Sequence, residues 1–165
     1  MLNIIKVKGK INLKALLVCI LIPVMVGYLS SRLTMDTFEV YQQLQKPSFS
    51  PPAWIFGPVW TILYILMGIA SYRIYMYGIN RRDVKVALLV YFIQLGFNFL
   101  WSIVFFRWQF RGLAYIIILI LAALILLTID KFYKIDRKAG ILMVPYLLWV
   151  VFASLLNLSI WLLNL

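Results

Sequence analysis

The sequence has no histidine, one cysteine and five acidic residues in a chain of 165. The single cysteine, Cys19, cannot form an intrachain disulfide. Because histidine is absent and the cysteine lies in an apolar run, no zinc, copper or haem-iron site and no metal-ligating residues are expected. The Ser–His and Cys–His modes of nucleophile activation are excluded for the same reason. Conventional acid–base enzymology is therefore not predicted.

Charged residues are scarce as well, at 13% against about 25% in globular proteins, whereas 65% of the residues are hydrophobic. A protein of 19.3 kDa has too little interior to hide that much apolar surface from water. The apolar runs are continuous rather than alternating, which favours membrane-spanning helices over a β-barrel. The predicted fold class is all-α: a polytopic membrane protein whose single domain, residues 1–165, forms a five-transmembrane-helix bundle. The expected spans are residues 14–31, 54–78, 86–106, 112–130 and 141–163.

The first span has features of a secretory signal peptide, because four lysines precede its apolar centre. It lacks a small-residue cleavage site, however, and Pro23 interrupts the apolar run. A retained span is the preferred interpretation, and a cleaved signal is the alternative.

The basic residues are distributed unevenly between the two sides that five spans define. Eleven of the 16 lie on the N-terminal side: Lys6, Lys8, Lys10, Lys14, Arg81, Arg82, Lys85, Lys131, Lys134, Arg137 and Lys138. Four lie on the other side: Arg32, Lys46, Arg107 and Arg111. The positive-inside rule then predicts a cytoplasmic N-terminus and a C-terminus outside. The excess of basic residues is thus interpreted mainly as a topology signal, with attraction to anionic lipid as a secondary interpretation and no nucleic-acid partner.

One connection is long, from residue 32 to residue 53 on the outer side, and three of its residues are prolines. Its aromatic residues and low net charge predict an ordered lid rather than a flexible linker. Arg73 lies near the cytoplasmic end of the second span, and its side chain is expected to reach the membrane interface. Cys19, Pro23 and Gly27 form a small-residue stripe on the first span, which predicts close helix packing.

Polar and aromatic side chains recur at helical spacing in three of the spans. These residues are Gly57, Trp60 and Tyr64 in the second span, Gln94, Asn98, Trp101 and Phe105 in the third, and Tyr146, Trp149, Ala153 and Asn157 in the fifth. Amide groups are costly in hydrocarbon unless they are paired, so these stripes are expected to face the bundle interior. They lie mostly in the outer half of the spans, beneath the long loop. A ligand pocket with aromatic walls and plain helix packing both remain open interpretations of this pattern.

Three blocks of the sequence carry a resemblance to a known family. The first is residues 44–64, LQKPSFSPPAWIFGPVWTILY, followed by Met67-Gly68. The second combines Gln94, Asn98, Trp101 and Phe105-Phe106, and the third combines Pro145-Tyr146, Trp149, Phe152-Ala153 and Leu156-Asn157. With its five spans and long first loop, the chain resembles the TspO/MBR family, which includes bacterial tryptophan-rich sensory proteins and the mitochondrial translocator protein.

The resemblance implies an integral protein of the bacterial cytoplasmic membrane that binds protoporphyrin IX or related tetrapyrroles and hydrophobic drug-like ligands. It implies a sensory or regulatory role and no required cofactor. The alternatives are a catalyst of light- and oxygen-dependent porphyrin degradation, acting through Trp60 and Trp149, and a small-molecule transporter. The expected ligand-binding residues are Tyr41, Pro47 and Ser48 in the lid and Trp60, Tyr64, Asn98, Trp101, Phe105, Trp149, Ala153 and Leu156 in the pocket.

Two features depart from the family pattern. Leu158 and Leu162 stand where the sterol motif of the mitochondrial relatives has Tyr and Arg, so no strong sterol site of that type is expected. Leu89 and Ile93 are bulky where small residues are associated with dimerisation, so a homodimer remains an open question.

Overall fold

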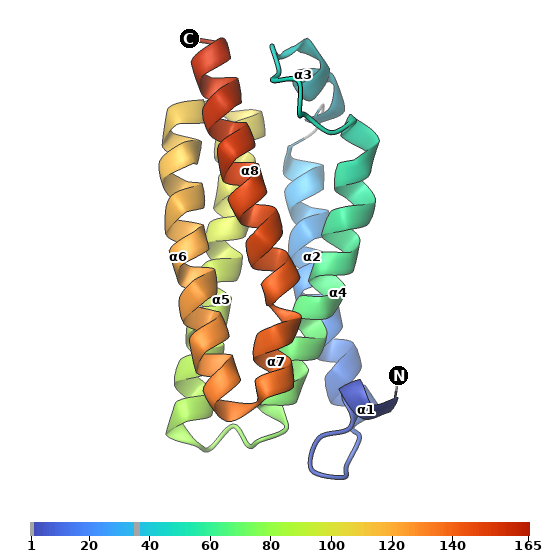
Figure 1. Ribbon diagram of the computed structural model, residues 1–165. Coiled ribbons are helices and arrows are strands. Elements are labelled where there is room, and N and C mark those ends of the chain that lie inside the picture. Colours follow the sequence, from blue (N-terminus) through green and yellow to red (C-terminus); the bar gives the residue numbers. More distant parts are fainter. Residues whose placement is uncertain (1, 35–36) are drawn as a thin grey trace.

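The computed structural model describes residues 2–34 and 37–165, which contain helices and no β-strand. Five long helices lie side by side and alternate in direction (Figure 1): α2 (Leu13–Leu33), α4 (Phe56–Tyr75), α5 (Arg82–Ser102), α6 (Arg111–Ile135) and α8 (Val144–Leu163). Shorter elements extend or connect them: α1 (Leu2–Ile5), α3 (Thr37–Gln43), the 3-10 turn η1 (Ala53–Ile55), the π-helical turn η2 (Ile103–Arg107) and α7 (Arg137–Leu142). The described chain has five helices long and apolar enough to cross a membrane, which confirms the predicted all-α membrane bundle.

The helices differ from the predicted spans mainly at one end of the bundle. Helix α5 begins at Arg82 rather than at residue 86, and α6 continues to Ile135 rather than to 130. Arg and Lys are good helix formers, so a helix need not stop where its apolar segment stops. The second span is shorter than expected, because α4 ends at Tyr75 and the chain turns at Gly78 with φ +108°.

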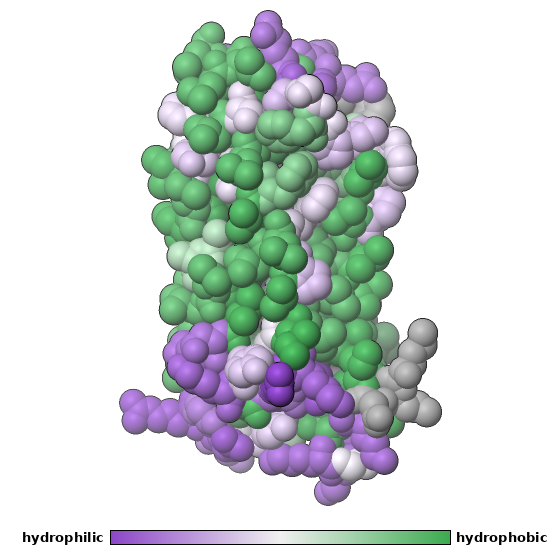
Figure 2. All heavy atoms as spheres, in the orientation of Figure 1, coloured by the Kyte–Doolittle hydropathy of each residue, from purple (hydrophilic) through white to green (hydrophobic). Residues whose placement is uncertain are grey.

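The two ends of the bundle differ in character. One end carries α3 and the C-terminus and is called the lid end; the other carries α1 and the N-terminus and is called the basic end (Figure 1). Figure 2 shows hydrophobic side chains over the middle of the visible face and hydrophilic side chains gathered at the basic end. This distribution is that of a protein whose middle lies in lipid.

Helix α2 approaches α4 closely, because small residues stand at their contact. A Cβ on Gly68 of α4 would lie 2.5 Å from Ile20 Cα and 2.8 Å from Cys19 O. A Cβ on Gly27 of α2 would lie 2.2 Å from the Tyr64 ring. The predicted small-residue stripe is therefore a packing surface, and the structure adds that Gly27 contacts an aromatic residue of the candidate site.

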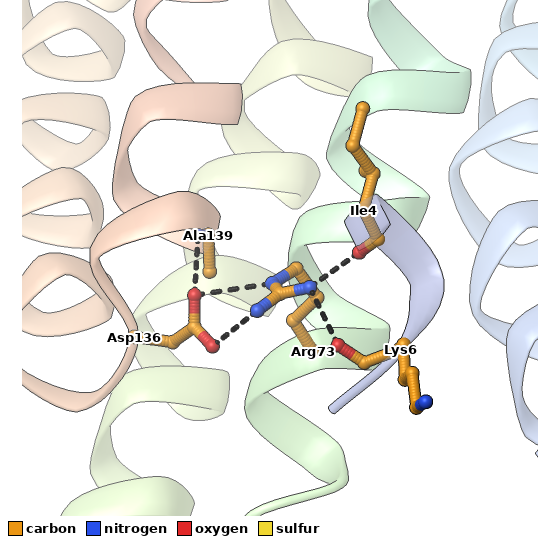
Figure 3. Close-up of polar contacts among 5 residues, drawn as sticks. All are labelled: Ile4, Lys6, Arg73, Asp136 and Ala139. Atoms are coloured by element: carbon orange, nitrogen blue, oxygen red, sulfur yellow. Dashed lines mark hydrogen bonds and ion pairs between the residues drawn. The ribbon is translucent and has the colours of Figure 1, made fainter. Parts of the chain in front are cut away.

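The Arg73 side chain lies at the basic end, where the end of its span was predicted, but it is buried among protein groups rather than exposed (Figure 3). Its Nη2 lies 2.7 Å from Asp136 Oδ2, and its Nε donates to Asp136 Oδ1 at 3.1 Å. Its Nη1 donates to the carbonyl oxygens of Ile4 and Lys6. Burial acts to raise the pKa of the Asp136 carboxyl, but hydrogen bonds from Arg73 and from the Ala139 N–H outweigh it and leave that pKa below its ordinary value. Arg73 thus joins α4, the α6–α7 junction and the N-terminal segment.

Candidate functional site

A cavity of about 520 Å³ lies at the lid end of the bundle, between α2, α4 and the α5–η2 junction. Its volume is within the range of small-molecule sites, about 300–1,000 Å³. Four of the expected site residues line it: Tyr41, Trp60, Tyr64 and Trp101. The structure therefore brings together residues from the lid, the second span and the third span around one space.

Two stacked rings form the α4 wall of this cavity. Trp60 and Tyr64 lie one turn apart, with ring centroids 5.4 Å apart and planes inclined by 29°. Gly27 on α2 leaves the space that the Tyr64 ring occupies, since any side chain there would overlap it. The α4 wall is thus aromatic, and the close contact with Gly27 of α2 fixes the position of the Tyr64 ring.

A hydrogen-bonded network across three helices lies beside this wall. The Tyr64 hydroxyl donates to Asn98 Oδ1 at 3.0 Å, and Asn98 Nδ2 donates to the Tyr146 hydroxyl at 3.1 Å. Asn98 is 1% exposed and does not line the cavity. Its amide oxygen and one of its N–H groups are engaged by tyrosines, so it orients Tyr64 rather than presenting an amide to the cavity.

The polar and aromatic residues of the third and fifth spans meet a second time, nearer the lid end. Trp101 Nε1 donates to Asn157 Oδ1 at 3.0 Å, and Asn157 Nδ2 donates to the Arg111 carbonyl at 3.0 Å. Phe105 stacks on Trp101 at 5.4 Å and is itself buried outside the cavity lining. These contacts hold the Trp101 indole in one orientation at the cavity edge.

The expected site residues of α8 lie behind the cavity rather than in its lining. Trp149 packs edge-on against Phe56, with centroids 5.9 Å apart, and Phe56 lines the cavity. The Trp149 Nε1 is buried and has no hydrogen-bond partner in the described part of the chain. Ala153 and Leu156 are buried in the hydrophobic core. Trp149 therefore contacts a cavity-lining ring, that of Phe56, without lining the cavity itself.

Helix α2 supplies one whole wall that was not expected from the sequence. Gly27, Ser30, Ser31 and Thr34 line the cavity, and the Thr34 hydroxyl donates to the Ser30 carbonyl at 2.8 Å. These positions continue the small-residue stripe at spacings of three and four. The hydroxyl groups at the end of an otherwise apolar helix are the signal that distinguishes this part of the stripe from plain packing.

The lid is ordered by contacts of its own over residues 37–53. The Tyr41 hydroxyl donates to the Pro51 carbonyl at 3.0 Å, and burial raises the pKa of that hydroxyl. Lys46 Nζ donates to the carbonyls of Tyr41, Gln42 and Leu44 at 2.8, 3.0 and 3.1 Å. The lid contains the predicted Pro47 and Ser48 in a turn closed by the Ser50 N–H to the Pro47 carbonyl. Neither residue lines the cavity.

The lid is also tied to the end of α8. Asn164 exchanges two hydrogen bonds with the Gln45 backbone, at 3.0 and 2.9 Å.

Asn164→Ala removes both hydrogen bonds between the lid and α8, and hydrogen bonds contribute about 0.5–1.5 kcal/mol each. Together they contribute about 1–3 kcal/mol, so cleavage by a glutamate-specific protease after Glu39, which is exposed in the lid, is expected to be at least about fivefold faster in the variant. Ser159→Ala, which alters an exposed hydroxyl of the same helix, serves as the control, and equal cleavage rates in both variants would contradict the tie.

The comparisons with known proteins agree with this architecture. A model of the TspO/MBR family matches residues 19–162. The chain is 43% identical over 157 residues to the tryptophan-rich protein TspO of Archaeoglobus fulgidus, covering 93% of this chain and 99% of the relative. It is 37% identical over 119 residues to the tryptophan-rich sensory protein of Cereibacter sphaeroides, covering 72% and 73%. It is 34% identical over 143 residues to the translocator protein of Bos taurus, covering 86% and 85%.

Proposed function

This chain belongs to the TspO/MBR family of membrane proteins, and on that premise we propose that it binds a porphyrin of the protoporphyrin IX type in the lid-end cavity. The observation that carries the proposal is the stacked Trp60–Tyr64 wall facing a cavity of about 520 Å³. A planar apolar ring system gains from aromatic side chains in the cavity wall, since offset or edge-on aromatic contacts contribute about 0.5–1.5 kcal/mol beyond buried area. The proposed role of the bound state is sensory or regulatory.

The same geometry sets the orientation of the ligand. The acidic side arms of the porphyrin must remain near water, because burying a charged carboxylate among the spans is costly. They therefore point toward the lid end, where Arg32 is exposed and Arg107 binds the Leu33 carbonyl at 3.1 Å. Lys46 contributes less, because three lid carbonyls already accept hydrogen bonds from its ammonium group.

A titration with protoporphyrin IX tests the proposal. Trp60→Phe removes part of the wall and is expected to weaken binding about two- to tenfold, measured by porphyrin absorbance or tryptophan quenching. Trp161→Phe is the control, because Trp161 contacts Tyr115 at the lid end of α8 and does not line the cavity. An equal loss in both variants would place the porphyrin elsewhere.

The light dependence of the same mixture separates binding from degradation. Trp60 and Trp101 both line the cavity, so their indoles would be the first protein groups exposed to a photoexcited porphyrin there. A stable complex in light and dark, with no protein-dependent product, is the result expected for a binding protein. A new product that forms only in light and only with the protein would assign porphyrin degradation instead.

We further propose that the basic end faces the cytoplasm, as the distribution of Lys and Arg indicates. In a Cys19→Ser background, a single cysteine near Pro51 should react with a membrane-impermeant reagent from outside intact cells. A single cysteine near Lys134 should not react until the membrane is opened. The reverse pattern would invert the orientation without changing the five-helix fold.

A further inference from the structure

A second cavity, of about 650 Å³, lies at the basic end, between the start of α5 and the end of α6. Four cationic side chains line it: Arg81 and Arg82 from the α5 end, and Lys131 and Lys134 from α6. One acidic residue, Asp83, is part of the same lining. The site is on the opposite end of the bundle from the lid, so it is separate from the proposed porphyrin cavity.

The ion pairs around this cavity leave two of its cations unpaired. Arg81 is paired with Asp83 through two hydrogen bonds of 3.1 and 2.5 Å, and Lys134 is paired with Asp130 at 2.7 Å. Arg82 and Lys131 have no ion pair within residues 2–34 and 37–165. The cavity therefore presents two unneutralised positive charges from two helices, and an anion is the complementary ligand.

An apolar strip leads away from the cationic lining along α5. Val86 lines the cavity, and Leu89 and Ile93 follow it at spacings of three and four, on the same helix face. Their side chains are exposed by 39%, 59% and 42% in the bundle. Since α5 is long and apolar enough to cross a membrane, this exposed strip is suited to contact with lipid chains. The complementary ligand thus has an anionic head and a long apolar tail.

We propose that this cavity binds the phosphate headgroup of an anionic phospholipid in the leaflet at the basic end. Arg82 and Lys131 contact the phosphate from the two helices, and an acyl chain follows Val86, Leu89 and Ile93 toward the middle of the membrane. Basic residues near an anionic membrane surface each contribute about fivefold in affinity, the equivalent of about 1 kcal/mol. A soluble phosphate would use the cations and leave the apolar strip without a role.

Native mass spectrometry of the detergent-solubilised full chain tests this assignment. The probes are phosphatidylglycerol and phosphatidylcholine with identical acyl chains. The protein is expected to retain phosphatidylglycerol in preference. Arg82→Gln/Lys131→Gln is expected to weaken that binding about 25-fold, and Lys131→Gln alone about fivefold. Thermal unfolding checks that both variants fold. If the double variant does not fold, the phosphatidylglycerol binding of Lys131→Gln alone tests the proposal.

The matched control removes the same charge from the same end. Lys10→Gln/Lys14→Gln alters two exposed lysines that do not line the cavity, and it is expected to change phosphatidylglycerol binding less than threefold. Equal losses in the two double variants would show a diffuse charge effect and overturn the site. Equal retention of phosphatidylcholine, or displacement of the lipid by equimolar inorganic phosphate, would overturn the assignment to an anionic phospholipid.

Discussion

Asp136→Ala is expected to lower the free energy of unfolding by about 3–5 kcal/mol, because it leaves a buried guanidinium without its counter-charge. The side chains of Arg73 and Asp136 are only 5% and 4% exposed, so water cannot replace the lost partner without opening the basic end. The change also removes the Asp136 hydrogen bond from the Ala139 N–H, which caps α7. Unfolding in a graded detergent or denaturant series measures the loss.

Two further variants test whether the loss of stability in Asp136→Ala comes from the unpaired buried charge. Asp130→Ala breaks an exposed pair with Lys134 on the same end of the bundle and should cost at most about 0.5 kcal/mol. Arg73→Met/Asp136→Leu removes both charges and should be less destabilising than Asp136→Ala, because no unpaired charge is left buried. If Asp136→Ala and Asp130→Ala lower stability equally, the buried pair does not hold the basic end together.

The buried Arg73–Asp136 pair also determines how the free energy of unfolding changes at acidic pH. The pKa of Asp136 is lower in the folded protein than its ordinary value near 3.8, so the folded state favours the ionised carboxylate. The contribution of the Asp136 carboxylate to the free energy of unfolding is therefore complete above the unfolded-state pKa. It is lost as the pH falls through the folded-state pKa. The pair is intact at neutral pH, and only strong acid is expected to break it, which the pH dependence of the free energy of unfolding measures.

The five spans could be predicted because bilayer thickness requires about 20 apolar residues per helix, whatever the packing. The sequence also predicted that the polar residues of the spans would meet inside the bundle. Costly amides must find partners inside a bundle, and Asn98 does so with Tyr64 and Tyr146.

The partner of Arg73 could not be predicted, because Asp136 lies 63 residues away and no local spacing connects them. Nearness to a span end is consistent with both an exposed and a buried arginine, and only tertiary packing decides. The position of Trp149 shows the same limit. Helical spacing gives the face of α8 on which it lies, but not that it packs against the cavity-lining Phe56 ring instead of lining the cavity itself.

Gly68→Ala is expected to destabilise the protein by about 1–3 kcal/mol, although alanine is the better helix former by about 1 kcal/mol. The added methyl group would lie 2.5 Å from Ile20 Cα and 2.8 Å from Cys19 O. Both are backbone atoms, so no side-chain rotation relieves the overlap and α2 must move away from α4. Because α2 carries the Gly27 to Thr34 wall of the lid-end cavity, porphyrin affinity should fall together with stability.

Gly96→Ala is the matched control, since a Cβ at Gly96 of α5 would meet nothing within 4 Å. Alanine is again the better helix former, and here its methyl group overlaps no neighbouring atom. Gly96→Ala should therefore be neutral or slightly stabilising. Thermal unfolding and a protoporphyrin IX titration of both variants give the two readouts. If Gly68→Ala matched Gly96→Ala in both, α2 would not be pressed against α4, and the spacing of the cavity walls would have to be set by the lid and by the Tyr64–Asn98–Tyr146 network instead.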